Sequence, residues 1–463
     1  MFKQVSKIGL CVALAGCNLA PKYLSPKPEV PAEFKTSGVW KHGRPAANTD
    51  RGEWWKIFGQ NRLNVLETEA TKANVSLEIA SYQVAEARAL AKADRAGIFP
   101  VLGVAASSRR TRNSGAVAIN FGGGRTITRN RGTVEVSYEV DLWSRARNTA
   151  KASQLDAEAQ EDLQQSVKLA VQAEVATTFF ALMAQDEAIA LLNRTLEVRK
   201  RAVELATARF KQGDTAQLDV AQAETDLAET EAEAIGLERR REELEHALAV
   251  LTGKPPAGFD IPSLELPGSA PSVPKSVPAD LLQRRPDIAA AERQMAALNA
   301  EIGVAKAALF PGITLGSSGG AESSLVSNLA SRAARVWGIG PELSWDLLSA
   351  GLNKAQVQAA TARYDQAAAA YKNTVLQAMR EVEDALSSID VLRRQLASQQ
   401  TTVAAAQKTV DLAQKRYDSG LVAYYEVLDA RRTLLRAEQE ATVIRGDLLT
   451  TTVQLIRALG GSW

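Results

Sequence analysis

Two carboxylates, Glu426 and Asp429, stand three positions apart shortly after a glycine, Gly420. On a helix this spacing places both acids on one face. Copies of such a pair arranged around an axis would form a ring of negative charge, which attracts cations at a constriction. The solvated face of a coiled coil carries acids at the same spacing, so both interpretations stay open.

A second reactive group is the thiol of Cys17. The preceding Leu14-Ala15-Gly16 resembles the bacterial lipobox, and residues 1–16 hold two lysines and an apolar core, as signal peptides do. We therefore predict a signal peptide over residues 1–16 and a lipidated Cys17 as the first residue of the mature chain. An ordinary signal peptide that contains a cysteine by chance is the alternative.

Groupings typical of catalysis are missing from the sequence. His42 and His246 are isolated, and Gly122-Gly123-Gly124 lacks the Lys-Ser/Thr that follows in a phosphate-binding loop. The formal charge of +2 falls to zero once the two lysines of the signal peptide are removed, which argues against nucleic acid as a partner. We expect no enzyme activity, no cofactor, no metal site and no nucleic-acid partner.

Two related turns must position the acids. Gly213 and Gly420 lie 207 positions apart, and each ends a run without glycine or proline, over residues 144–212 and 352–419. Glycine readily adopts the left-handed conformation that ends a helix. The sequence therefore predicts two long helical hairpins with related tips.

Apolar residues seven positions apart continue through both hairpins. Val203 and Phe210 in the first hairpin have Val410 and Tyr417 as counterparts in the second. This spacing is that of a coiled-coil seam, which a plain antiparallel scaffold would show as well. After the signal peptide no run of about 18 apolar residues occurs, so we expect no transmembrane helix.

Alternating apolar and polar residues predict four strands, each near the roughly 9–11 residues that cross a bilayer as tilted β-structure. A sheet with one face in water would alternate in the same way. The strands are expected over residues 98–110, over 133–142, from Ile313 onward, and over 337–347. A Gly/Asn/Arg loop is expected over 111–130 and a Ser/Gly/Ala loop after Leu315.

Four strands are too few to close a barrel. An open sheet edge in lipid leaves backbone groups unpaired, at several kcal/mol each. If these strands lie in a membrane, the chain must therefore oligomerise. Tyr138, Trp143 and Trp345 suit an aromatic belt at the membrane interface.

The same order of elements occurs twice, which indicates an internal duplication in a mixed α and β fold. In each half a helix, expected over residues 63–96 and from Pro286, precedes a pair of strands and a long helical hairpin. The expected segments are a lipidated extended strap over residues 17–60, a first repeat over 61–254, a Pro-rich equatorial linker over 255–280 and a second repeat over 281–463.

Several motifs give the chain a specific resemblance. They stand at Cys17–Tyr23, Leu281–Ile288, Glu301–Pro311, Tyr425–Ala430 and Ala458–Gly461. With them the chain resembles the bacterial outer-membrane efflux proteins of the TolC superfamily, in the lipoprotein branch that includes OprM and NodT. The resemblance covers essentially the whole mature chain.

The resemblance implies a lipid-anchored homotrimer in the cell outer membrane with a large periplasmic portion. Each chain would give four strands to a twelve-stranded β-barrel and its hairpins to a periplasmic α-barrel. The implied function is a passive conduit that carries pumped substrates from the periplasm to the exterior and is gated at the helix tips. The implied partners are outer-membrane lipid, a periplasmic adaptor protein and an inner-membrane pump of the RND type, which largely sets the substrate.

The resemblance also assigns roles at the tips. It places constricting acids at Glu426 and Asp429, and an acid matching Asp219 that hydrogen-bonds a tyrosine matching Tyr417. Because Tyr417 also occupies a seam position, a packing role and a locking role stay open. Some relatives carry an arginine where this chain has Val422, so that arginine-based lock is absent. The residues expected to face the adaptor are Gly213, Asp214, Thr215, Gly420, Leu421 and Val422.

A rival from another class is a lipid-anchored periplasmic coiled-coil scaffold without a pore. The alternating strands argue against it.

Lipidation of Cys17 is the first testable prediction. Asn18 is not the aspartate that retains lipoproteins in the inner membrane of well-studied relatives, so we expect sorting to the outer membrane. Mass spectrometry of the mature protein should find a diacylated Cys17 at its N-terminus. Cleavage at another bond, or an unmodified Cys17, would contradict the prediction.

Overall fold

The computed structural model describes residues 17–26, 52–112, 114, 126–272 and 284–461. The predicted signal peptide, the Gly122-Gly123-Gly124 loop and parts of the expected strap and Pro-rich linker lie outside these residues. The chain forms two compact units, each built from both predicted repeats. The sheet unit contains Gln83–Glu161, Ala290–Lys372 and residues 17–26, and the hairpin unit contains Asp162–Ala289, Asn373–Trp463 and residues 52–82.

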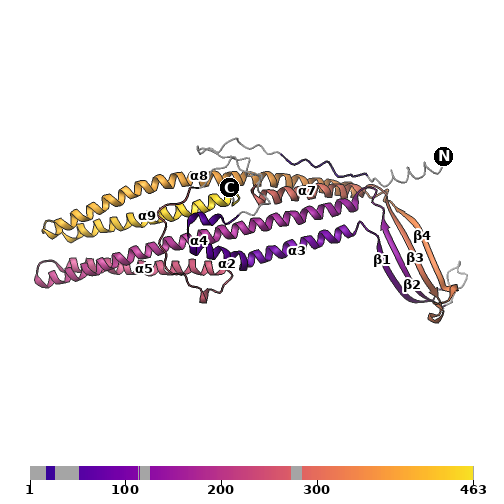
Figure 1. The fold of residues 1–463 in the computed structure, drawn as a ribbon, viewed down its shortest axis with the longest axis horizontal. Helices are drawn as coiled ribbons and strands as arrows, with labels where there is room; N and C mark the ends of the chain where they lie inside the picture. The colour runs from indigo at the N-terminus through magenta and orange to yellow at the C-terminus, as the bar shows by residue number, and fades with distance from the viewer. Residues whose placement is uncertain (1–16, 27–51, 113, 115–125, 273–283, 462–463) are drawn as a thin grey trace. The chain divides into compact units, whose positions relative to one another are not determined.

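One antiparallel sheet forms the end of the sheet unit (Figure 1). Its strands pair in chain order, which leaves the first and last strands as free edges. Most of the apolar side chains on these strands are exposed, with Val104 at 81 % and Ile339 at 77 %. The strands are β1 (Val101–Arg112), β2 (Thr126–Glu139), β3 (Gly312–Ser323) and β4 (Arg335–Ser344).

The strands confirm the predicted number but correct the predicted bounds. Residues 126–130 belong to β2 rather than to a loop, and the Ser/Gly/Ala stretch after Leu315 continues β3. The extent of these strands is set by hydrogen bonds between neighbouring backbones, which form whatever the side chains are. A Cβ at Gly320 would lie 2.0 Å from the Gly132 carbonyl oxygen, so the small residue permits the close approach of β3 to β2.

The predicted strand over residues 133–142 is too long at its end. Val140 still donates its N–H to the Ile313 carbonyl at 2.8 Å, but the Leu142 N–H bonds the Val140 carbonyl at 2.8 Å. This tight turn takes the chain out of the sheet after Glu139. β4 likewise ends at Ser344, so Trp345, Asp346 and Leu347 lie beyond it rather than within the predicted strand.

The helices agree closely with the predicted hairpins. The α4 helix begins at Arg145 because Ser144 has a φ of +59°. The helix expected over residues 63–96 is interrupted at Asn74, whose Oδ1 accepts the N–H groups of Ser76 at 2.9 Å and Leu77 at 3.2 Å. The helices are α2 (Asn61–Ala73), α3 (Val75–Ala96), α4 (Arg145–Gln212), α5 (Gln217–Leu251), α7 (Pro286–Ala307), α8 (Leu352–Asp418) and α9 (Tyr424–Ala458).

We expected no helix able to cross a membrane. Within the described residues, α4 is long and apolar enough to do so by length and composition alone. Of its most apolar window, 56 % is buried inside the protein, and buried core helices pass the same test.

The main core of the hairpin unit surrounds the middle of α4. Phe179 and Phe180 of α4 are fully buried, and Phe180 lies 4.8 Å from the Phe58 ring between centroids. Phe58 belongs to a short 3₁₀ helix, Trp54–Phe58, within the residues expected as an extended strap. Trp54 and Trp55 are also buried there, so this end of the strap contributes to the core.

An acid is enclosed in the same region. Glu67 of α2 is fully buried, and neither carboxyl oxygen has a hydrogen-bond partner among the described residues. Burial disfavours the ionised form and raises the pKa of Glu67 to about 9. Glu67 is therefore a neutral acid at pH 7.

Replacement of Glu67 should change how stability depends on pH. The unfolded carboxyl loses its proton near pH 4.5 and the folded one near pH 9, so the folded state binds more protons between these values. The free energy of unfolding should therefore fall as pH rises, by at most about 1.4 kcal/mol per pH unit. Glu67→Gln should remove this dependence in urea unfolding between pH 5 and pH 9. The exposed Glu174→Gln is the control, and parallel curves for wild type and Glu67→Gln would contradict the prediction.

The faces of β2 give a further prediction. Val134, Val136 and Tyr138 should face lipid, with Glu135 and Ser137 facing the lumen. An arginine at Val136 should destabilise the inserted protein by about 2–4 kcal/mol, whereas Ser137→Arg should have little effect. Unfolding from lipid vesicles measures both, and equal tolerance would refute the membrane assignment. The same pattern is expected for Val140, Ile339, Leu343 and Trp345 toward lipid, and for Glu139, Glu342 and Asp346 toward the lumen.

Candidate functional site at the helix tips

Both hairpins end in the same type of turn. Gly213 has a φ of +82° and Gly420 a φ of +69°, so glycine is required at each. At the first tip the Gly213 N–H bonds the Phe210 carbonyl at 3.0 Å, and the Asp214 N–H bonds the Arg209 carbonyl at 2.9 Å. The same two bonds recur at the second tip, both at 2.9 Å, from Gly420 to Tyr417 and from Leu421 to Arg416. These are Schellman turns, which satisfy the last carbonyls of α4 and α8.

Tyr417 packs in the seam behind the second turn. Its ring lies 5.4 Å from that of Tyr424 between centroids, and the Arg209 guanidinium stands 4.7 Å over it. Tyr424 and Val427 are buried in the same cluster, where burial raises the pKa of Tyr424. Within one protomer, Tyr417 thus makes the packing contacts that its heptad position predicts.

The predicted acids differ in their surroundings. Glu426 and Asp429 are exposed on α9, and Glu426 lies 3.7 Å from Arg416. Asp219 is half-buried at the start of α5 and accepts a hydrogen bond from the Thr215 hydroxyl. Among the described contacts of one protomer, Asp219 and Tyr417 share no hydrogen bond. Their role as a lock therefore stays a prediction.

A groove lies between α5 and α9 near the tips, with a volume of about 330 Å³. Leu218 and Tyr425 on its walls are 64 % and 59 % exposed. Asp429 and Arg432 also line this groove. Its lining therefore combines apolar side chains with one carboxylate and one guanidinium group. It is lined by Leu218, Ala221, Gln222, Thr225, Tyr425, Leu428, Asp429 and Arg432.

An ionic clamp, formed by the buried Asp226 and Arg199 with the partly exposed Arg432, joins the two hairpins. The Asp226 carboxylate, 3 % exposed, lies 3.0 Å from Arg199 Nε of α4 and 2.8 Å from Arg432 Nε of α9. Arg199 also donates to the Asp226 carbonyl at 2.7 Å and to the Thr230 hydroxyl. One acid of α5 therefore holds a helix from each hairpin through charge-assisted bonds.

The clamp raises the pKa of Arg432 through its hydrogen bond to Asp226, whereas burial lowers the pKa of Arg199. The sequence analysis did not identify these residues. The positions 207 residues after Arg199 and Asp226 hold Ala406 and Thr433, so the Arg199–Asp226 pair occurs in the first repeat and has no counterpart in the second.

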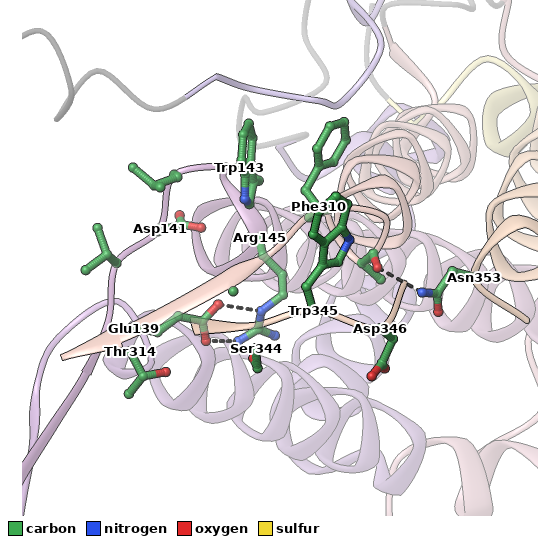
Figure 2. A pocket seen from close by; sticks show the side chains of 15 residues that line it. Glu139, Asp141, Trp143, Arg145, Phe310, Thr314, Ser344, Trp345, Asp346 and Asn353 are labelled. Carbon is green, nitrogen blue, oxygen red and sulfur yellow. Dashed lines mark hydrogen bonds and ion pairs between the residues drawn. The ribbon is translucent and has the colours of Figure 1, made fainter. Parts of the chain in front are cut away.

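A second pocket, of about 410 Å³, lies in the sheet unit where strands meet helices. Figure 2 shows Glu139 and Arg145 facing one another across it, with the Arg145 Nε donating to Glu139 at 2.8 Å. This hydrogen bond raises the pKa of Arg145. The Trp143 ring stacks on Phe310 with 4.7 Å between centroids, and its Nε1–H donates to the Pro311 carbonyl at 2.8 Å. Trp143 is thus fixed at the end of the sheet, where an interface belt is expected.

Cys17 is exposed as a free thiol in the sheet unit. Across the part of the chain that the structure describes, no group of three or more His, Cys, Asp or Glu side chains could hold a metal ion.

Comparison with known proteins places this geometry in a family. The model of the outer membrane efflux protein family matches residues 66–254 and 277–461. The solvent efflux pump outer membrane protein SrpC of Pseudomonas putida is 32 % identical over 471 residues, which cover 100 % of this chain and 98 % of that protein. The probable outer membrane lipoprotein SilC of Salmonella typhimurium is 31 % identical over 468 residues, or 100 % of both chains.

Solved structures agree with the sequence relatives. The outer-membrane channel OprN superimposes with a TM-score of 0.88 at 30 % identity, over 96 % of this chain and 100 % of that one. A structure of CusC gives a TM-score of 0.86 at 27 % identity, over 96 % of this chain and 100 % of that one. The chain therefore belongs to the outer membrane efflux protein family of the TolC superfamily and is an outer-membrane efflux channel.

Proposed function

We propose that three copies of the chain form one channel, the outer-membrane part of a tripartite efflux system. The observation that carries this proposal is a four-stranded sheet with two free edges and exposed apolar side chains. Pairing of β4 with β1 of the next copy would satisfy both edges and close a twelve-stranded barrel. The channel is a passive conduit and not an enzyme.

The periplasmic partners are a membrane fusion adaptor and an inner-membrane pump of the RND type. The exposed turns at Gly213–Thr215 and Gly420–Val422 are the surfaces for the adaptor. Relatives are named for solvents and for cations, which fits a conduit whose substrate is chosen by the pump. The lipid on Cys17 anchors the chain in the outer membrane.

The alternative is a lipid-anchored scaffold without a pore. Single-channel recording of the purified protein in a planar bilayer separates the two functions. A channel gives discrete conductance steps, whereas a scaffold gives none at any protein concentration.

Gating at the tips gives the fourth prediction. In the closed trimer, Glu426 and Asp429 would contribute six carboxylates to one ring, which divalent cations can bridge. Their double replacement by alanine should weaken block by divalent cations and reduce cation selectivity in single-channel recordings. Cation block that survives loss of both acids would assign them to a solvated coiled-coil face.

Tyr417→Phe separates the lock from the seam, because it keeps the ring and removes the hydroxyl. Higher conductance with an unchanged melting temperature supports a lock with Asp219. Unchanged conductance assigns Tyr417 to packing alone.

The clamp at Asp226 gives the fifth prediction. We propose that it makes the two hairpins of one protomer move together, so that the tube opens between protomers. Asp226→Asn leaves the buried Arg199 without its counter-charge, whereas the partly exposed Arg432 keeps Glu229, and should lower the free energy of unfolding by about 3–5 kcal/mol. Arg416→Ala, which breaks the exposed pair with Glu426, should lower it by less than about 1 kcal/mol. Similar losses in urea unfolding for the two variants would contradict the clamp.

A further inference from the structure

The mature N-terminal residues follow a defined track over the sheet unit. The Cys17 carbonyl accepts a hydrogen bond from the Ser144 hydroxyl at 3.3 Å, immediately before α4. The Asn18 Oδ1 accepts from Asn148 Nδ2 at 3.0 Å, one turn into α4. Neither Ser144 nor Asn148 is more than 2 % exposed, so both donors depend on this segment.

The track continues along α7. The Pro21 carbonyl accepts from Asn299 Nδ2 at 2.9 Å, and the Tyr23 hydroxyl donates to Glu292 Oε1 at 2.6 Å. Glu292, Asn299 and Gly303 are seven and four positions apart, so they lie on one face of α7. The segment thus runs antiparallel to α7 and contacts it over three turns.

Gly303 is the closest point of this contact. A Cβ at Gly303 would lie 2.7 Å from the Ala20 Cβ, 2.9 Å from the Ala20 Cα and 2.4 Å from Asn148 Nδ2. Alanine is otherwise preferred to glycine inside a helix. Passage of Ala20 therefore explains a glycine that the helix itself does not favour.

The helix α5 offers a matched comparison. Gly236 also lies inside a helix, but a Cβ there would have no atom within 4 Å. Gly303→Ala and Gly236→Ala are the same chemical change, and only the first meets the N-terminal segment.

We propose that Cys17–Tyr23 is a docked strap and that Asn148, Glu292, Asn299 and Gly303 form its receptor. The receptor fixes the first mature residue next to Trp143, at the junction of sheet and helices. Acyl chains on Cys17 then enter the membrane at the level of the Trp143–Phe310 stack, with no slack between the anchor and the sheet. Only the placement of acyl chains depends on the proposed lipidation of Cys17. The docking of the strap does not, because all its contacts come from the polypeptide.

A nitroxide at position 22 tests the docking. Lys22 is exposed between two contact residues, and a lipidated Cys17 cannot react, so Lys22→Cys gives a single labelling site on the full mature chain. The spectrum should be that of an immobilised label and should become mobile on addition of Gly303→Ala, but not of Gly236→Ala. An immobilised label in the Gly303→Ala protein would overturn the proposal.

A double variant tests the docking if the Gly303→Ala protein does not fold. Tyr23→Phe with Asn299→Ala removes two strap bonds without adding an atom to α7, and it should also mobilise the label. A label that stays immobilised in this variant contradicts the receptor.

Removal of the lipid separates this inference from the proposed function. In Cys11→Ser/Cys17→Ser, which keeps position 22 as the single labelling site even if residues 1–16 are retained, and with loss of acylation verified by mass spectrometry, the label should remain immobilised. A mobile label would show that the lipid and not the receptor holds the strap. Single-channel recording of the same proteins reports on the pore independently of the strap.

Discussion

The structure depends on one constraint, which is that backbone hydrogen-bonding groups in lipid must be paired. The four-stranded sheet meets this requirement inside the protomer and fails it at β1 and β4. Exposed apolar side chains, among them Val104, Trp337 and Ile339, lie on these edge strands. Charged residues occur on both edge strands as well, and β4 contains Pro341. Pairing of these edges between three copies, as we propose, would also bring the helical hairpins around a common axis. Nothing in the hairpins alone would require a tube.

The two repeats have the same turn at the hairpin tips but differ in the charged residues that connect the hairpins. Both turns use a positive-φ glycine and the same pair of backbone bonds, so the two hairpins end in the same way. The charges that join the hairpins occur in only one arrangement, where Asp226 bonds Arg199 and Arg432. The corresponding residues of the second repeat, Ala406 and Thr433, carry no charge and cannot form such ion pairs. The bond between hairpins joins the buried Asp226 to Arg432, which is partly exposed and also pairs with Glu229. We propose that these charge-assisted bonds favour motion between protomers over motion within one.

The sequence was sufficient for features with a local cause. Gly213 and Gly420, at positions that need a left-handed backbone conformation, located both tips. The long runs free of glycine and proline predicted the bounds of α4 and α8 to within a residue. Strand bounds were missed where the cause is pairing, as in the Ser/Gly-rich half of β3. The neutral Glu67, the clamp at Asp226 and the reason for Gly303 were also missed. Each depends on which distant segment packs against the residue, and that information is not contained in spacing along the chain.

The central claim is that the edges of this sheet are paired between copies in the membrane. Amide hydrogen exchange of the lipidated protein in lipid bilayers measures this directly, strand by strand. The account predicts that β1 and β4 are as strongly protected as β2 and β3, because all four would be interior strands of a closed barrel. Fast exchange confined to the outward N–H groups of β1 and β4, with β2 and β3 protected, would contradict it.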